Sequence, residues 1–219
     1  MKGNNSLLGM VALICLIVTV IWLALFIYDV AARGAVETAE QAVASVADLG
    51  ALQILTYVNA TLVTVSATML FGGLYVLCRD EAPLWAAMGL VFVPIYGLLN
   101  LFAYLSQLTI VPRLAALRPA SDLLVAQMVQ AWPGSVVNVL NNLGYAVLGV
   151  PSIVFGSLLA RRRSLRYAGL LMALNGVACI VGLVGIAAGS ELLSLGSIVG
   201  GAVFLVALGP LSVGLLREP

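Results

Sequence analysis

The sequence predicts an all-α polytopic membrane protein, a single domain of six transmembrane helices over residues 1–219. Hydrophobic residues make up 63% of the chain and charged residues only 9%, whereas a soluble domain has roughly 25% charged residues. The mean hydropathy of +1.14 points the same way. These observations exclude a water-soluble globular protein.

Six segments are long and apolar enough to cross a bilayer. About 30 Å of hydrocarbon takes roughly 20 helical residues, because the backbone must satisfy its hydrogen bonds within each segment. We expect the spans at about residues 7–28, 52–77, 84–107, 135–159, 165–188 and 192–216. The first is longer than the roughly 7–15-residue apolar core of a secretory signal, so we expect it to remain as a helix of the protein.

The basic residues predict that both termini are cytoplasmic. With the N-terminus inside, the cytoplasmic segments hold seven of the ten basic residues and the outer segments hold three. The cluster of Arg161, Arg162, Arg163 and Arg166 contributes most to this bias. We interpret it as a topology anchor; binding of an anionic lipid or a partner is the alternative. The expected location is the plasma (inner) membrane, as a multi-pass protein.

The two long outer loops, the first and the third, are predicted to contain amphipathic helices. They cover residues 29–51 and 108–134. In the first loop, apolar residues recur at helical steps opposite polar ones; they are Val36, Ala39, Val43, Val46 and Leu49. In the third loop, Ser121 or Asp122 can cap a helix that runs to Trp132. Such helices either seal the bundle or form a lid over a site.

Several classes of function lack the residues that they need. The chain has no His, and its three cysteines (Cys15, Cys78 and Cys179) form no C-x-x-C motif. We therefore expect buried cysteines, no metal site and no cofactor. We place all nine carboxylates outside the middle of a span, which disfavours a proton-coupled pump. A net charge of +1 offers no basic footprint for nucleic acid.

Neutral polar side chains instead form stripes on spans two, three and four, in the half of the membrane away from the termini. Each stripe repeats at steps of three and four residues and so lies on one helical face. The candidate ligand-binding residues in these stripes are Tyr57, Tyr96, Asn100, Tyr104, Asn138, Asn141, Asn142 and Tyr145. No catalytic residue is assigned.

Two interpretations of these stripes stay open. Amides and phenols in lipid must face one another or a cavity, because an unpaired polar group there costs several kcal/mol. They are either interhelical hydrogen bonds that hold the bundle together or the polar lining of an outward-opening pocket. Kinks at Pro94, Pro151 and Pro210 would widen a cavity or only curve the helices.

Spans five and six carry glycines at close-packing spacing. Gly185 and Gly189, and Gly196 and Gly200, stand four residues apart, and such small residues let helix backbones approach. We interpret them as tight packing within this hairpin, with a dimer face as the alternative.

The chain resembles a family of uncharacterised six-helix bacterial integral membrane proteins, a domain of unknown function. The resemblance covers about residues 37–190 and rests on the stretches 73–77, 98–103 and 144–146, the arginine cluster and the apolar helix after it. Members often carry an Arg in span three, where this sequence has Val93, Pro94 and Ile95. The resemblance implies the six-helix fold and no activity.

The expected function is that of a non-enzymatic membrane protein that binds or passes a neutral or amphiphilic small molecule from the outer side. The alternative is an accessory or structural subunit that docks a partner in a larger membrane complex. A membrane enzyme is a third hypothesis, which would have to use Tyr, Ser or loop acids such as Asp48, Asp122 and Glu191. Expected partners are the bilayer, a lipid or small neutral ligand, and a second copy or partner subunit.

Overall fold

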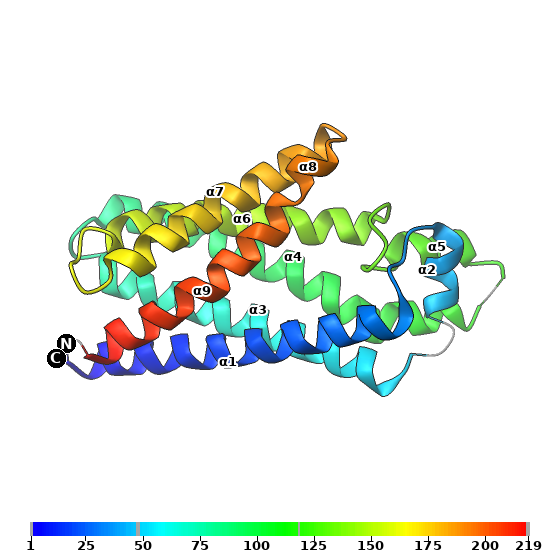
Figure 1. The fold of residues 1–219 in the computed structure, drawn as a ribbon, viewed down its shortest axis with the longest axis horizontal. Helices are drawn as coiled ribbons and strands as arrows, with labels where there is room; N and C mark the ends of the chain where they lie inside the picture. Colours follow the sequence, from blue (N-terminus) through cyan, green and yellow to red (C-terminus); the bar gives the residue numbers. More distant parts are fainter. Residues whose placement is uncertain (1, 47–48, 118, 218–219) are drawn as a thin grey trace.

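The computed structural model describes residues 2–46, 49–117 and 119–217, and every regular element within these ranges is a helix (Figure 1). The elements are α1 (Lys2–Arg33), α2 (Ala39–Ser45), α3 (Ala51–Cys78), α4 (Pro83–Ala115), α5 (Asp122–Met128), α6 (Val136–Leu159), α7 (Arg166–Ala187), α8 (Glu191–Ser194) and α9 (Gly196–Arg217). Six stretches are long and apolar enough to cross a membrane: Asn5–Arg33, Ala51–Cys78, Pro83–Ala115, Val136–Leu159, Arg166–Ala187 and Glu191–Arg217. The prediction of an all-helical, multi-pass membrane protein is confirmed.

The bundle has two distinct ends. Figure 1 shows the N- and C-termini side by side at one end, together with the short connections from α3 to α4 and from α6 to α7. We call this the terminal end. The opposite end, here called the loop end, carries α2 and α5 (Figure 1). Towards the loop end, α7, α8 and the start of α9 lean away from the other long helices (Figure 1).

The six long helices form a closed ring in the order α1, α3, α4, α6, α7, α9, and each packs against the next. Three aromatic rings meet in its middle: the Phe71 centroid lies 6.1 Å from that of Phe155 and 6.2 Å from that of Phe204. We call these residues the phenylalanine cluster. The main apolar core contains this cluster and extends from it to the terminal end, where it includes Leu8, Leu74, Leu159, Leu165 and Leu211.

Two long helices extend beyond the predicted spans. α1 runs to Arg33 rather than to residue 28, because Asp29 and Arg33 form an i,i+4 ion pair that stabilises the extra turn. Gly34 then ends the helix with a φ of 81° and donates its N–H to the Val30 carbonyl at 2.8 Å. α4 runs to Ala115 rather than to residue 107 and accommodates Pro112.

Short helices occur in both long loops, and both are shorter than predicted. α2 begins where the Thr38 hydroxyl accepts a hydrogen bond from the Gln41 N–H. α5 begins at Asp122, but the Ser121 hydroxyl does not cap it and donates instead to the Leu114 carbonyl at 2.6 Å. α2 and α5 pack together over a second apolar cluster that includes Val43, Val46, Val111, Val125 and Val129.

The predicted tight packing of the glycine-rich hairpin is confirmed at Gly182, Gly185, Gly196 and Gly200, but it is wrong for Gly189, which has a φ of 65° and open space where a Cβ would point. A Cβ on Gly182 would lie 2.4 Å from the Ser197 nitrogen, and one on Gly185 would lie 2.3 Å from the Ser194 nitrogen. A second close contact, between α6 and α7, escaped the sequence analysis. There, a Cβ on Gly149 would lie 2.6 Å from the Gly176 carbonyl oxygen. Backbone approach on both sides of α7 therefore leaves no room for side chains at these positions.

Arg162 ties the α6–α7 turn to the end of α3. Its guanidinium donates to the Leu77 carbonyl at 2.9 Å and to the Glu81 carboxylate at 2.5 Å. We expect Arg162→Gln to lower the free energy of unfolding by about 1 kcal/mol, because the ion pair is partly exposed and the carbonyl loses a charged donor. Thermal unfolding in detergent measures this. Arg161→Gln, at an exposed neighbouring residue, is the matched control, and an equal loss there would contradict the assignment.

Candidate functional site

The predicted polar residues lie between the phenylalanine cluster and the loop end, where α4 and α6 meet through amides. The Asn141 amide donates to the Asn100 side-chain oxygen at 2.6 Å, and the Asn100 amide donates to the Tyr96 carbonyl at 3.3 Å. Asn100 is fully buried and Asn141 is 4% exposed. These two asparagines thus bond to each other inside the bundle.

Phenols extend this contact. The Tyr104 and Tyr145 hydroxyl oxygens lie 2.5 Å apart, and Tyr104 also lies beside the Asn141 side chain. The Tyr96 hydroxyl lies beside Thr64 of α3. Five of the eight predicted residues therefore form one connected group on α4 and α6: Tyr96, Asn100, Tyr104, Asn141 and Tyr145.

The other two asparagines bond to the loop that precedes α6. The Asn138 amide donates to the Gln130 carbonyl at 2.9 Å, and the Asn142 amide donates to both oxygens of Asn138 at 3.0 Å. The Gln130 side chain in turn donates to the Asn141 side-chain oxygen at 3.2 Å. Sequence analysis missed Gln130, because it lies beyond α5 and outside any helical repeat.

Gln107 fixes the same loop from α4. Its amide nitrogen donates to the Met128 carbonyl at 2.9 Å, and its oxygen accepts from the Gln130 N–H at 3.1 Å. Gln107 is only 2% exposed, and its side-chain nitrogen and oxygen both form hydrogen bonds with the backbone of the loop. The third loop is thereby held onto α4 and α6.

Tyr57 is the predicted residue that stands apart from this group. It is half-buried on α3, within electrostatic range of Tyr104 and of the Asp29–Arg33 pair. Within the described ranges, no group hydrogen-bonds to its hydroxyl. The oxygen of the Asn142 side chain likewise has no partner there, since both Asn142 bonds use its nitrogen. These two groups remain available to another molecule.

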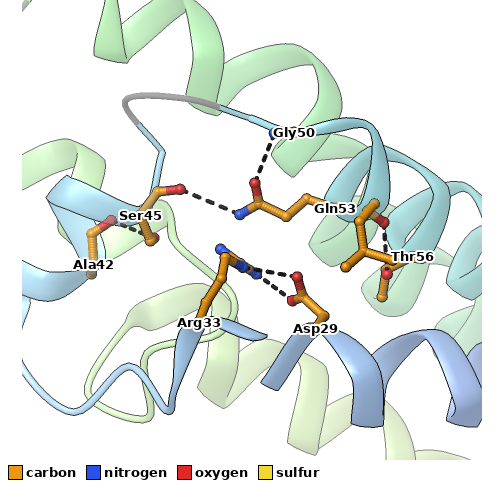
Figure 2. Close-up of polar contacts among 8 residues, drawn as sticks. Asp29, Arg33, Ala42, Ser45, Gly50, Gln53 and Thr56 are labelled. Carbon is orange, nitrogen blue, oxygen red and sulfur yellow. Dashed lines mark hydrogen bonds and ion pairs between the residues drawn. The ribbon is translucent and has the colours of Figure 1, made fainter. Parts of the chain in front are cut away.

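Two sets of polar contacts lie side by side at the loop end, one within α1 and one around Gln53 of α3 (Figure 2). The Arg33 Nε donates to Asp29 at 2.8 Å, and a second contact joins Arg33 Nη2 to the other carboxylate oxygen. Above this pair, Gln53 accepts from the Gly50 N–H at 3.0 Å and donates to the Ser45 carbonyl at 3.3 Å (Figure 2).

Asp29 corrects the sequence analysis, which placed it in the first outer loop. It lies within α1 and is 9% exposed. A carboxylate tolerates this burial because the guanidinium four residues on neutralises it with two contacts. The i,i+4 spacing of Asp29 and Arg33 was visible in the sequence, and reading it as a helical pair would have found this ion pair.

The threonine hydroxyls of the α3 stripe form hydrogen bonds within their own helix. Thr61, Thr64 and Thr68 donate to the carbonyls four residues earlier at 2.9, 3.0 and 2.8 Å. Two buried polar atoms in the described part of the chain lack any partner, Asn59 Oδ1 on α3 and Ser197 Oγ on α9. Both lie in the loop-end half of their helices, so this half is the one that leaves polar groups unsatisfied.

An apolar hollow of about 370 Å³ lies between α3 and α4 beside Pro94. Its other lining residues are Val65, Thr68, Met69, Gly97, Leu98 and Leu101. Met69 and Leu98 are 60% and 71% exposed, so the hollow opens outward from the ring. None of the eight predicted residues lines it.

The three cysteines are free and buried, as predicted. Across residues 2–46, 49–117 and 119–217, His, Cys, Asp and Glu form no group of three that could hold a metal ion. Comparison with protein-family models, with curated proteins and with solved structures finds no match to this chain. The resemblance to the six-helix bacterial family therefore rests on the quoted residues alone.

Proposed function

We propose that this chain is a non-enzymatic membrane protein, with both termini in the cytoplasm, that holds a neutral amphiphilic molecule in the loop-end half of its helix ring. The binding groups would be Tyr57 and Asn142. The network of Asn100, Tyr104 and Asn141 would hold α4 and α6 in place around the ligand. Of the two interpretations of the polar stripes, interhelical hydrogen bonding would thus apply to Asn100, Tyr104 and Asn141, and ligand binding to Tyr57 and Asn142.

One observation carries this proposal: the ring changes from apolar to polar at the level of the phenylalanine cluster. Below that level, apolar side chains pack the ring. Above it, Tyr57 and Asn142 are half-buried, and each keeps an oxygen without a hydrogen-bond partner among the residues that the structure describes. A small number of polar groups among apolar side chains is typical of small-molecule sites, and the uncharged chemistry of Tyr57 and Asn142 favours a neutral ligand.

The orientation is supported by the position of the basic residues. Arg79, the arginine cluster of the α6–α7 turn and Arg217 all belong to helix ends or turns at the terminal end. Basic residues gather on the cytoplasmic side of membrane proteins. The loop end, with the candidate site, would then face outward, and the ligand would enter from that side.

Photolabelling with a diazirine diacylglycerol tests the site. In phosphatidylcholine vesicles, we expect labelling of the loop-end half to be competed by unlabelled diacylglycerol, because a specific site saturates whereas the lipid-facing surface does not. Tyr57→Phe and Asn142→Leu should each reduce the competed labelling about fivefold, as expected for one lost hydrogen bond of about 1 kcal/mol.

Tyr28→Phe is the matched control, since Tyr28 is 66% exposed on α1. Labelling that is not competed, or that falls equally in the control, would refute the proposal. A companion protein that copurifies in mild detergent, together with unsaturable labelling, would favour the accessory-subunit alternative.

A further inference from the structure

Three arginines of the α6–α7 turn point away from the bundle at the terminal end. Arg161, Arg163 and Arg166 are exposed, whereas their neighbour Arg162 is half-buried and bonded to α3. We call the three exposed residues the arginine surface. Figure 1 shows this turn beside the α3–α4 connection, at the end that carries both termini.

The charges of the arginine surface are not neutralised within the described ranges. The two carboxylates of the adjacent α3–α4 turn are engaged by other arginines: Asp80 lies 3.7 Å from Arg79, and Glu81 lies 2.5 Å from Arg162. No carboxylate pairs with Arg161, Arg163 or Arg166 in that part of the chain. A net charge of about three is therefore displayed on one short turn.

The turn that carries these arginines is anchored at two points. Leu165 is fully buried in the apolar core, where its Cδ2 packs so closely on α9 that a Cβ on Gly214 would lie 2.5 Å away. Arg162 fixes the other side of the turn to the Leu77 carbonyl. The arginines between and beside these anchors thus lose little backbone entropy when they bind.

The arginine surface also lies at the ends of two candidate membrane spans, the depth at which lipid headgroups are expected. Arg161 follows the end of α6 at Leu159 by two residues, and Arg166 is the first residue of α7. Both helices are candidate membrane spans. Tyr167, next to Arg166, is 78% exposed, and tyrosines are enriched at the membrane interface.

From this charge, anchoring and depth we infer that the arginine surface binds the phosphate of an anionic phospholipid headgroup. Guanidinium groups match phosphate oxygens in a two-pronged geometry. Attraction of a basic residue to an anionic surface amounts to about 1 kcal/mol, or about fivefold in affinity for each arginine. This site lies at the opposite end from the proposed ligand and does not depend on it.

Thermal unfolding of the full chain in dodecylmaltoside tests this inference. We expect phosphatidylglycerol, but not phosphatidylcholine, to raise the unfolding temperature in a saturable manner. The triple variant R161Q/R163Q/R166Q should raise the half-saturating concentration of phosphatidylglycerol about 100-fold. The triple lysine variant should stay within a few-fold of the parent, because it keeps the charge.

Arg113→Gln is the control, since Arg113 is exposed at the loop end; this variant should respond to phosphatidylglycerol as the parent does. An equal response to both lipids would overturn the inference, as would a phosphatidylglycerol effect that survives in the triple glutamine variant. If glycerol phosphate gave the same rise at the same concentration, the site would bind a free phosphate rather than a lipid, and the inference would again fail.

Discussion

Gly156→Ala is expected to destabilise the protein by about 1–3 kcal/mol, although alanine is the better helix former. A Cβ at this position would lie 2.6 Å from both the Ala173 nitrogen and the Gly169 carbonyl oxygen. These are backbone atoms of α7, which cannot rotate away as a side chain can. Overpacking of this kind typically costs about 1–3 kcal/mol. It should outweigh the gain in helix propensity, which is at most about 1 kcal/mol.

Reversible unfolding in mixed micelles measures this change, and Gly72→Ala is the matched control. Gly72 lies within α3 and has open space where a Cβ would point. Its substitution should leave the free energy of unfolding unchanged or raise it by up to about 1 kcal/mol. Opposite signs for the two substitutions are the expected result. A neutral Gly156→Ala would contradict the close contact of α6 with α7.

The second large effect is expected at the Asn100–Asn141 pair. Asn100→Leu should lower the free energy of unfolding by about 1–3 kcal/mol, because it leaves the buried Asn141 amide without its acceptor at 2.6 Å. Asn141→Leu should cost a similar amount. The double variant should cost less than the sum, since it removes both amides together.

A double-mutant cycle measures the coupling of these two residues, which we expect at about 0.6–1.7 kcal/mol, the range of interhelical hydrogen bonds in membranes. Asn142→Leu is the control. Asn142 is half-buried, so its substitution should cost less than about 1 kcal/mol without ligand. Strict additivity of Asn100→Leu and Asn141→Leu would contradict a direct hydrogen bond between them.

Local sequence patterns predicted the helical elements well. The apolar runs locate all six candidate spans, and short helices occur in both long loops. The errors lie at helix ends. α1 continues to Arg33 because of a side-chain pair, and α5 stops at Met128 before Trp132. Capping and pairing decide such ends, and hydropathy alone does not describe them.

The candidate site was predictable only as a set of residue types. The stripes located Asn100, Tyr104, Asn141 and Tyr145, and the structure brings these four together. It left Tyr57 apart, and it added Gln130 and the buried Asp29. Residues that meet from different helices depend on how each helix is rotated against its neighbour, and a stripe on one helix does not contain that information.

The sequence by itself determined that this chain is a six-helix membrane protein. Hydrocarbon forces each span to satisfy its own backbone hydrogen bonds, so a span is a local property of about 20 residues. Only the tertiary structure decided which polar groups pair and which stay free. Asn100 and Asn141 are 41 residues apart and bond at 2.6 Å, whereas the side-chain oxygen of the adjacent Asn142 has no partner in the described part of the chain. Consecutive residues point about 100° apart around a helix axis, so Asn141 and Asn142 cannot face the same neighbour. Only the packing of α4 against α6 determines which of the two faces inward.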